Sequence, residues 1–174
     1  EGRSIVHPCK ECGGEGRKFN SRNIKVKIPA GVDNGSHLVV RGEGEAGVRG
    51  NSPGDLYVVI QVNPSDVFQR VDYDLIVEVP ISVSQAALGE EIKVPTIDNE
   101  VSIKIHEGTQ TGTKFRLRGK GVPYVDDHGS GDLYVIVNVV IPKKVSKEQR
   151  KIFEDLKKTE DKKSLIDKIK EFAK

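Results

Sequence analysis

An internal repeat with an offset of 77 residues is the strongest constraint on how this chain can fold. Thirteen of the 35 positions in residues 28–62 (the first repeat) are identical to those in residues 105–139 (the second repeat), without a gap. The two longest matches are Arg-Gly-x-Gly at 41–44 and 118–121, and Gly-Asp-Leu-Tyr-Val at 54–58 and 131–135. Self-similarity of this kind predicts two similar domains in tandem, related by duplication.

Each repeat belongs to a unit with the pattern of β-structure. Alternating apolar residues open the units at 24–28 and 101–105, as in half-buried strands. The glycines of Arg-Gly-x-Gly tolerate the positive φ that a sharp turn needs. Gly-Asp then opens the strands richest in β-branched and aromatic residues, Leu56–Val62 and Leu133–Ile141. We expect these two strands to be covered on both faces.

The segment between the repeats predicts a strand, a short helix and a hairpin. Asp74–Val79 has strand character, and Val83–Leu88 reads as a helix that ends at Gly89. Asp98-Asn99 lies between two apolar runs and predicts a hairpin turn. We place the first domain at residues 20–71 and the second at 72–142.

The last 32 residues, 143–174, predict a helical tail. Ser146 and Gln149 have the spacing of a capping box. Ile152, Phe153 and Leu156 then share one helical face, and the polar run 157–163 is expected to break the helix. A second apolar stripe follows at Leu165, Ile169 and Phe172.

The tail is basic, with 12 Lys and Arg against 7 Asp and Glu. A charged amphipathic segment without a core of its own needs a partner surface. Self-association is the favoured interpretation, and packing against its own domain is the main alternative. Capture of nucleic acid or membrane is a third, weaker one, because no aromatic residues interleave with the basic ones.

Composition argues for a soluble binding protein. Hydrophobic residues make up 36% and charged residues 31%, and no apolar run approaches the roughly 18 residues of a membrane span. The net charge of +2 disfavours a dedicated nucleic-acid binder. The four histidines are scattered and no nucleophile–base pattern accompanies them. We therefore predict no enzymatic activity.

Residues 9–16 read Cys-x-x-Cys-x-Gly-x-Gly, with Cys9 and Cys12 as the only cysteines. Two thiolates can hold one side of a tetrahedral zinc ion, which needs about two further ligands, and His7 is a nearby candidate. This spacing is typical of a reducing compartment, so we expect the cytoplasm. Residues 1–3, Glu-Gly-Arg, recur at 15–17 and resemble the end of a preceding copy of the motif. We assign residues 1–19 to the remnant of a cysteine-rich zinc-binding region.

The chain resembles the type I DnaJ co-chaperones, in which four such cysteine motifs precede two similar β-sandwich domains. It is similar to a bacterial member from the fourth cysteine motif onward. The resemblance implies a mainly β fold of two tandem β-sandwich domains followed by a helical dimerisation segment. Besides the cysteine motif, it is carried by Ile-Pro-Ala-Gly-Val-Asp-Asn-Gly at 28–35, Gly-Glu-Gly-Glu-Ala-Gly at 42–47, Ala-Ala-Leu-Gly-Glu at 86–90, Val-Pro-Thr at 94–96 and Gln-Thr-Gly at 110–112.

The resemblance also implies a function. Family members hold unfolded client polypeptides and deliver them to the DnaK chaperone, whose ATPase is stimulated by a J-domain that this sequence lacks. The family's client groove maps onto Ile24 and Val58, with Val26 and Ile60 as same-face neighbours, although ordinary core packing is the alternative for each. Part of that groove is built in the family from strands before the cysteine region, so the first domain is expected to be incomplete.

The remaining implications concern metal and assembly. In the family the fourth cysteine motif shares its zinc with the first, so Cys9 and Cys12 are expected to be unmetallated or irregularly ligated here. The C-terminal helix is the family's dimerisation element, for which Ile152, Phe153 and Leu156 are the candidates. Neither nucleic acid nor membrane is an expected partner. The rival hypothesis is a zinc-dependent nucleic-acid-binding or scaffolding module without client binding.

Overall fold

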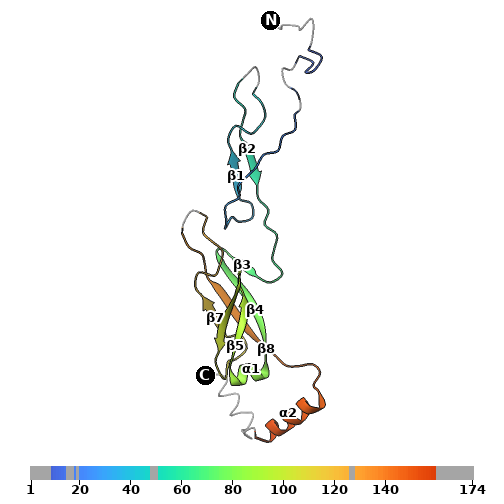
Figure 1. Cartoon of the computed structure of the whole chain (residues 1–174), viewed down its shortest axis with the longest axis vertical. Coiled ribbons are helices and arrows are strands. Elements are labelled where there is room, and N and C mark those ends of the chain that lie inside the picture. Colours follow the sequence, from blue (N-terminus) through green and yellow to red (C-terminus); the bar gives the residue numbers. More distant parts are fainter. Residues whose placement is uncertain (1–8, 15–17, 19, 48–50, 126–127, 160–174) are drawn as a thin grey trace, which may run out of the picture.

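The computed structural model describes residues 9–14, 18, 20–47, 51–125 and 128–159. The chain is mainly β, as predicted, and its sheets are open rather than closed into a barrel. In Figure 1 the β1–β2 hairpin and a larger β-rich body lie end to end along the longest axis. The strands are β1 (His37–Val40), β2 (Leu56–Val59), β3 (Gln69–Val71), β4 (Asp74–Ser82), β5 (Glu90–Pro95), β6 (Glu100–Ile105), β7 (Lys114–Leu117) and β8 (Leu133–Val140), and the helices are α1 (Val83–Leu88) and α2 (Lys147–Thr159).

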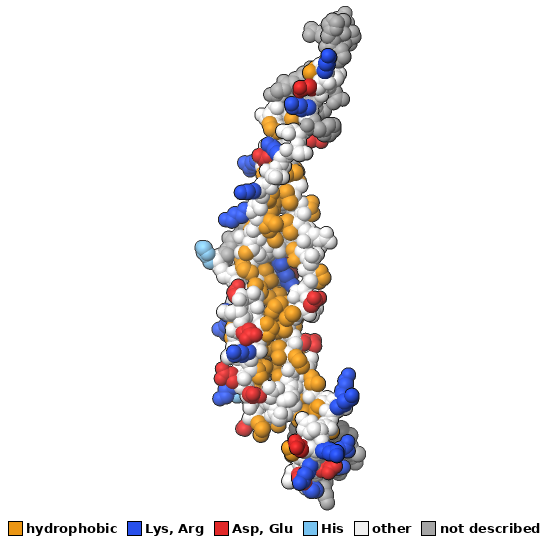
Figure 2. Space-filling model, turned by 45° about the vertical axis from the view of Figure 1, so that its right-hand side comes forward, with side chains coloured by type: hydrophobic (Ala, Val, Ile, Leu, Met, Phe, Trp, Pro, Cys, Tyr) orange, Lys and Arg blue, Asp and Glu red, His pale blue; other side chains and the backbone are white. Residues whose placement is uncertain are grey.

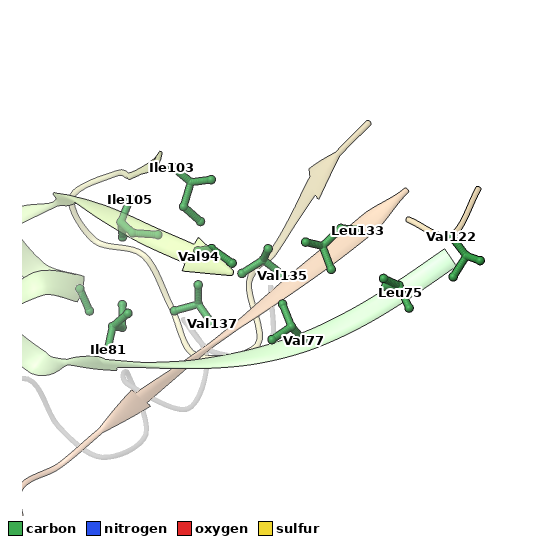
Figure 3. Packing of buried hydrophobic residues seen from close by; sticks show 11 residues of the cluster. Leu75, Val77, Ile81, Val94, Ile103, Ile105, Val122, Leu133, Val135 and Val137 are labelled. Carbon is green, nitrogen blue, oxygen red and sulfur yellow. The ribbon is translucent and has the colours of Figure 1, made fainter. Parts of the chain in front are cut away.

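The larger body is built on a four-stranded sheet in the order β3-β4-β8-β7, here called the large sheet. β4 and β8 run parallel over eight residue pairs, while β3 and β7 pair antiparallel at the two edges. A separate antiparallel hairpin, β5–β6, contributes side chains to the same core. Figure 3 shows side chains from this hairpin pointing toward those of β4 and β8, which makes the body two-layered.

The core lies between these two layers. Val94, Leu133, Val135 and Val137 are 0% exposed. From Leu133 to Asn138, the residues of β8 alternate between buried and half-buried, as expected for a strand with both faces at least partly covered, while Val140 at its end is exposed. All of the buried hydrophobic residues in the described segments fall between Leu75 and Val137. The first repeat therefore contributes nothing to this fully buried cluster.

The predicted short helix and hairpin are confirmed. The backbone N–H of Gln85 donates to Ser82 Oγ at 3.1 Å, and that of Ser82 donates to Gln85 Oε1 at 2.8 Å, which completes a capping box for α1. Gly89 ends the helix with φ of 74°, and a Cβ there would lie 2.8 Å from the carbonyl oxygen of Ile105. At the β5–β6 turn, Thr96 Oγ1 donates to the Asn99 carbonyl oxygen at 2.7 Å.

The predicted opening strand at Ile24–Ile28 is wrong, because the structure assigns no strand to the described residues before β1. Its counterpart in the other unit, β6, is a strand because it pairs with β5. The offset of 77 places the counterpart of β5 at residues 13–18, and the described residues there include the turn glycines of the cysteine motif. A strand needs a partner for its backbone hydrogen bonds, and none of the described residues supplies one here.

The predicted strand Leu56–Val62 is shorter than expected and is not covered on both faces. β2 ends at Val59, and Tyr57 and Val59 are 66% and 63% exposed. Its counterpart β8 is flanked by β7 and β4, whereas β2 pairs with β1 alone in the described part of the chain. The same sequence pattern therefore yields a buried strand in one repeat and an edge strand in the other.

The predicted capping box of the tail helix is confirmed. The N–H of Gln149 donates to Ser146 Oγ at 3.1 Å, and that of Ser146 donates to Gln149 Oε1 at 2.9 Å. The helix continues past Lys157 to Thr159, and the rest of the polar run, 160–163, lies outside the described residues. The stripe at Leu165, Ile169 and Phe172 lies outside the described residues. Neither described helix has the length and apolar character needed to cross a membrane.

Candidate functional site

The hairpin of the first repeat is held in shape by hydrogen bonds that recur in the second. Gly42 N donates to Asp55 Oδ1 at 2.9 Å, and Gly119 N donates to Asp132 Oδ1 at 2.9 Å. The carboxylate of the Gly-Asp step thus braces the Arg-Gly-x-Gly turn. Sequence reasoning did not assign this role, although the joint recurrence of the two motifs was its signal.

The two glycines of Arg-Gly-x-Gly serve different purposes. Gly42 adopts φ of 68°, so the predicted positive φ is confirmed at this position. Gly44 is needed for space instead, because a Cβ there would lie 2.6 Å from the Asp55 carbonyl oxygen. This close approach lets the Gly44 N–H donate to the Gly54 carbonyl oxygen at 2.8 Å. The turn therefore holds Gly54, two residues before β2 begins, next to Gly44.

One edge of β2 has no strand partner among the described residues. The N–H of Ile60 donates to the Ser36 carbonyl oxygen at 2.9 Å, and the carbonyl oxygen of Ile60 accepts from the Gly35 N–H at 2.8 Å. Both hydrogen bonds lie on the β1 side. Peptide groups alternate in direction along a strand, so those of Tyr57 and Val59 point to the opposite edge. In the second repeat β4 occupies that edge of β8. In the described residues, no strand pairs with the corresponding edge of β2.

Apolar side chains cover both faces of this hairpin. On one face Leu38 and Val58 are direct cross-strand partners, and both are half-buried. On the other face Val39, Tyr57 and Val59 are 49–66% exposed. The counterpart of Val58 in the second repeat, Val135, is 0% exposed. The first repeat thus leaves accessible an apolar surface that the second repeat buries.

The four residues predicted to bind clients are placed as follows. Val58 lies in β2, and Ile60 lies directly after it with its backbone tied to the loop before β1. Ile24 and Val26 lie in the non-strand segment 20–28 and are half-buried, while Lys25 and Lys27 between and after them are exposed. All four are therefore partly buried, although only Val58 lies in a strand.

Cys9 and Cys12 lie on a tight turn in which the N–H of Gly13 donates to the Cys9 carbonyl oxygen at 2.8 Å. Backbone N–H groups of Glu11 and Cys12, and then the Cys12 side chain, lower the pKa of the Cys9 thiol below its ordinary value. Two cysteines on one turn, with the Cys9 thiol supported by backbone amides, fit one half of a zinc site. No group of three or more potential ligands occurs among the described residues, which do not include His7.

The three dimerisation candidates lie on α2, which has no buried residue in the described structure. Ile152, Phe153 and Leu156 are 67%, 40% and 50% exposed. Exposed large apolar residues gathered on one helical face are costly in water unless another surface covers them. The helix therefore presents an apolar stripe available to a partner.

Comparison with known proteins places these features in a family. The family model described as "DnaJ C terminal domain" matches residues 10–142. The chain is 49% identical over 152 residues to the "Chaperone protein DnaJ" of Acetivibrio thermocellus, 50% over 151 residues to that of Parageobacillus thermoglucosidasius, and 47% over 164 residues to that of Pelagibacter ubique. These alignments cover 87–94% of this chain and 39–44% of the relatives, so the chain spans about two fifths of their length. It belongs to the DnaJ C-terminal domain family.

Proposed function

We propose that this chain binds non-native polypeptides at the free edge of β2, as the client-binding part of a DnaJ co-chaperone. The observation that carries the proposal is the contrast between the repeats. β8 has a neighbour on each side, whereas β2 has β1 alone among the described strands and displays accessible apolar side chains beside its open edge.

Strand addition suits a binder of many different sequences. A guest segment in extended conformation would pair its backbone with the N–H and carbonyl groups of Tyr57 and Val59, which requires no particular guest sequence. Its alternate side chains would then rest on the apolar faces of the hairpin. Ile24, Val26, Val58 and Ile60 are the residues we assign to the half-buried face of this site.

Delivery of clients to DnaK is proposed for the longer protein of which this family domain forms a part. In that setting we assign Cys9 and Cys12 as two of the zinc ligands, with further ligands to complete a tetrahedral set. A bound zinc would hold the cysteine turn in a fixed shape. The need for reduced thiols is consistent with our expectation of a cytoplasmic protein.

We further propose that two chains pair through α2. Pairing would cover Ile152, Phe153 and Leu156, and it would place two weak client sites on one particle. Two linked sites bind a long unfolded chain more tightly than one, since the second contact becomes intramolecular. Dimerisation would thus raise the affinity for clients without any new contact.

Suppression of the aggregation of a chemically denatured protein, followed by light scattering, tests the client site. The wild-type chain should suppress aggregation, and Val58→Asp should weaken suppression several-fold by placing a charge on the apolar face. Ile141→Asp is the matched control, because Ile141 is 75% exposed and lies after β8, far along the chain from β2. Equal loss in both variants, or no suppression by the wild type, would refute the proposal.

A further inference from the structure

A pocket of about 900 Å³ lies where the segment joining the two repeats passes the large sheet. One wall comes from residues 62–70 and Asp72, which follow β2 and include most of β3, together with Asp33 and Asn34 of the loop before β1. The other comes from β4 and from Ile97 in the β5–β6 turn. The volume falls within the roughly 300–1,000 Å³ range of ligand-binding pockets. The residues assigned to the β2 edge do not line it, so it is a separate site.

The lining of the pocket combines one buried core residue with exposed apolar side chains. Leu75 is 4% exposed and belongs to the hydrophobic core, so the pocket shares a wall with the best-packed part of the protein. Val67 and Ile97 are 54% and 52% exposed. On the face shown in Figure 2, hydrophobic side chains form a stripe along the long axis of the molecule. The pocket can therefore desolvate a large apolar side chain of a guest.

The charges of the lining are one-sided. Four carboxylates contribute, whereas Arg70 is the single cationic residue that lines the pocket. The guanidinium of Arg70 already donates to the backbone carbonyl oxygens of Gly31, Val32 and Asp72, and its Nη2 also lies 4.0 Å from Asp33 Oδ1, so Arg70 offsets the charge of Asp33 but not of the other three carboxylates. Because the chain as a whole carries +2, this negative character is local. The carboxylates belong to Asp33, Asp66, Asp72 and Glu78.

We propose that this pocket binds an extended polypeptide segment in which a large apolar side chain stands next to lysine or arginine. The apolar side chain would fill the space beside Val67 and Ile97, and the cation would face Asp66 and Glu78. Opposite charge attracts such segments and repels acidic ones, which gives a selectivity that pairing along a strand edge lacks. The inference rests on the proposed function, because the guest is a client polypeptide, but it assigns the guest a second contact point.

The test is fluorescence anisotropy with two labelled eight-residue peptides of equal apolar content, one with lysines and the other with glutamates flanking a central phenylalanine. The lysine peptide should bind several-fold more tightly, and the preference should shrink between low and high salt. The double variant Asp66→Asn with Glu78→Gln should weaken its binding about fivefold, since each exposed charge pair contributes roughly 0.2–1 kcal/mol. Ile97→Ser should weaken binding of both peptides.

Controls separate this site from the β2 edge. Glu107→Gln removes an exposed carboxylate from the turn beside Gly89, outside the pocket, and should leave the affinity unchanged. Val58→Asp should weaken aggregation suppression several-fold without changing lysine-peptide affinity. Equal binding of the two peptides, or equal effects of the pocket variants and Glu107→Gln, would overturn the inference. Competition between the peptide and self-association of the chain would also overturn it, since the occupant would then be a second copy.

Discussion

Arg70 donates from Nη1 to the backbone carbonyl oxygen of Val32 at 2.9 Å, and thereby ties the large sheet to the loop of the first repeat. Nη2 of the same side chain donates to the Gly31 carbonyl oxygen at 3.0 Å. Gly31 itself has φ of 85°, and a Cβ there would lie 2.0 Å from the Pro123 carbonyl oxygen. Its repeat counterpart, Gly108, has open space at the same point. One glycine of the repeat is thus required by a contact between the two bodies, and the other by its positive φ of 73° alone.

Replacement of Arg70 by Met should loosen the junction, because it removes the donors while it keeps most of the apolar stem. Spin labels at Val39 and Ser102, in a chain with both cysteines changed to Ser, would report the distance between the two bodies by double electron–electron resonance. We expect a clearly broader distance distribution in Arg70→Met than in wild type. Arg150→Met, on α2, is the control and should leave the distribution unchanged. An unaltered distribution in Arg70→Met would show that the guanidinium does not hold the junction.

The two repeats should respond differently to the same truncation. Val135→Ala opens a cavity in the closed core and should lower the free energy of unfolding by about 2 kcal/mol. Val58→Ala, at the equivalent half-buried position, should cost less than about 1 kcal/mol, because water already reaches part of the side chain. Urea denaturation followed by circular dichroism measures both. Equal losses would mean that Val58 is as well buried as Val135.

The elements that sequence reasoning predicted correctly are those determined by nearby residues. The short helix that ends at Gly89, the capping box at Ser146 and the turn at Asp98-Asn99 need only contacts within a few positions. The strand predicted at 24–28 did not form because a strand needs a partner. β6 pairs with β5, whereas the described residues of the equivalent segment 13–18 include no strand. The same dependence explains why β2 is an exposed edge and β8 a buried strand.

The candidate site was predictable only in part for the same reason. Val58 was proposed for the site from the family resemblance alone, whereas the role of Asp55 requires knowledge of where its carboxylate points. The hydrogen bonds of Arg70 reach residues that lie 38 and 39 positions earlier in the sequence. No local sequence pattern predicts such contacts. The residues that line the pocket beside β3 and β4 likewise come together only after β4 and the β5–β6 turn have folded.

Metal binding by the cysteine turn gives a further test. The thiolate pair should take up cobalt or zinc weakly, and the uptake should be lost in Cys9→Ser and in Cys12→Ser, since one thiolate cannot hold the ion alone. The thiolate-to-cobalt absorption band measures occupancy. Uptake near half an equivalent would indicate two chains around one ion, whereas tight one-to-one uptake would contradict the half-site assignment. His7→Ala then tells whether that imidazole supplies a further ligand.

Self-association should depend on the apolar stripe of α2. Light scattering of the wild-type chain should give about twice the monomer mass of 19.1 kDa. Leu156→Glu places a charge among residues that pairing would bury, so the mass should fall to that of the monomer. Lys151→Glu introduces the same side chain on the opposite side of the helix and should leave the dimer intact. Since α2 lies outside the segment matched by the family model, a monomeric wild type at high concentration would remove dimerisation from this chain while leaving the client site untouched.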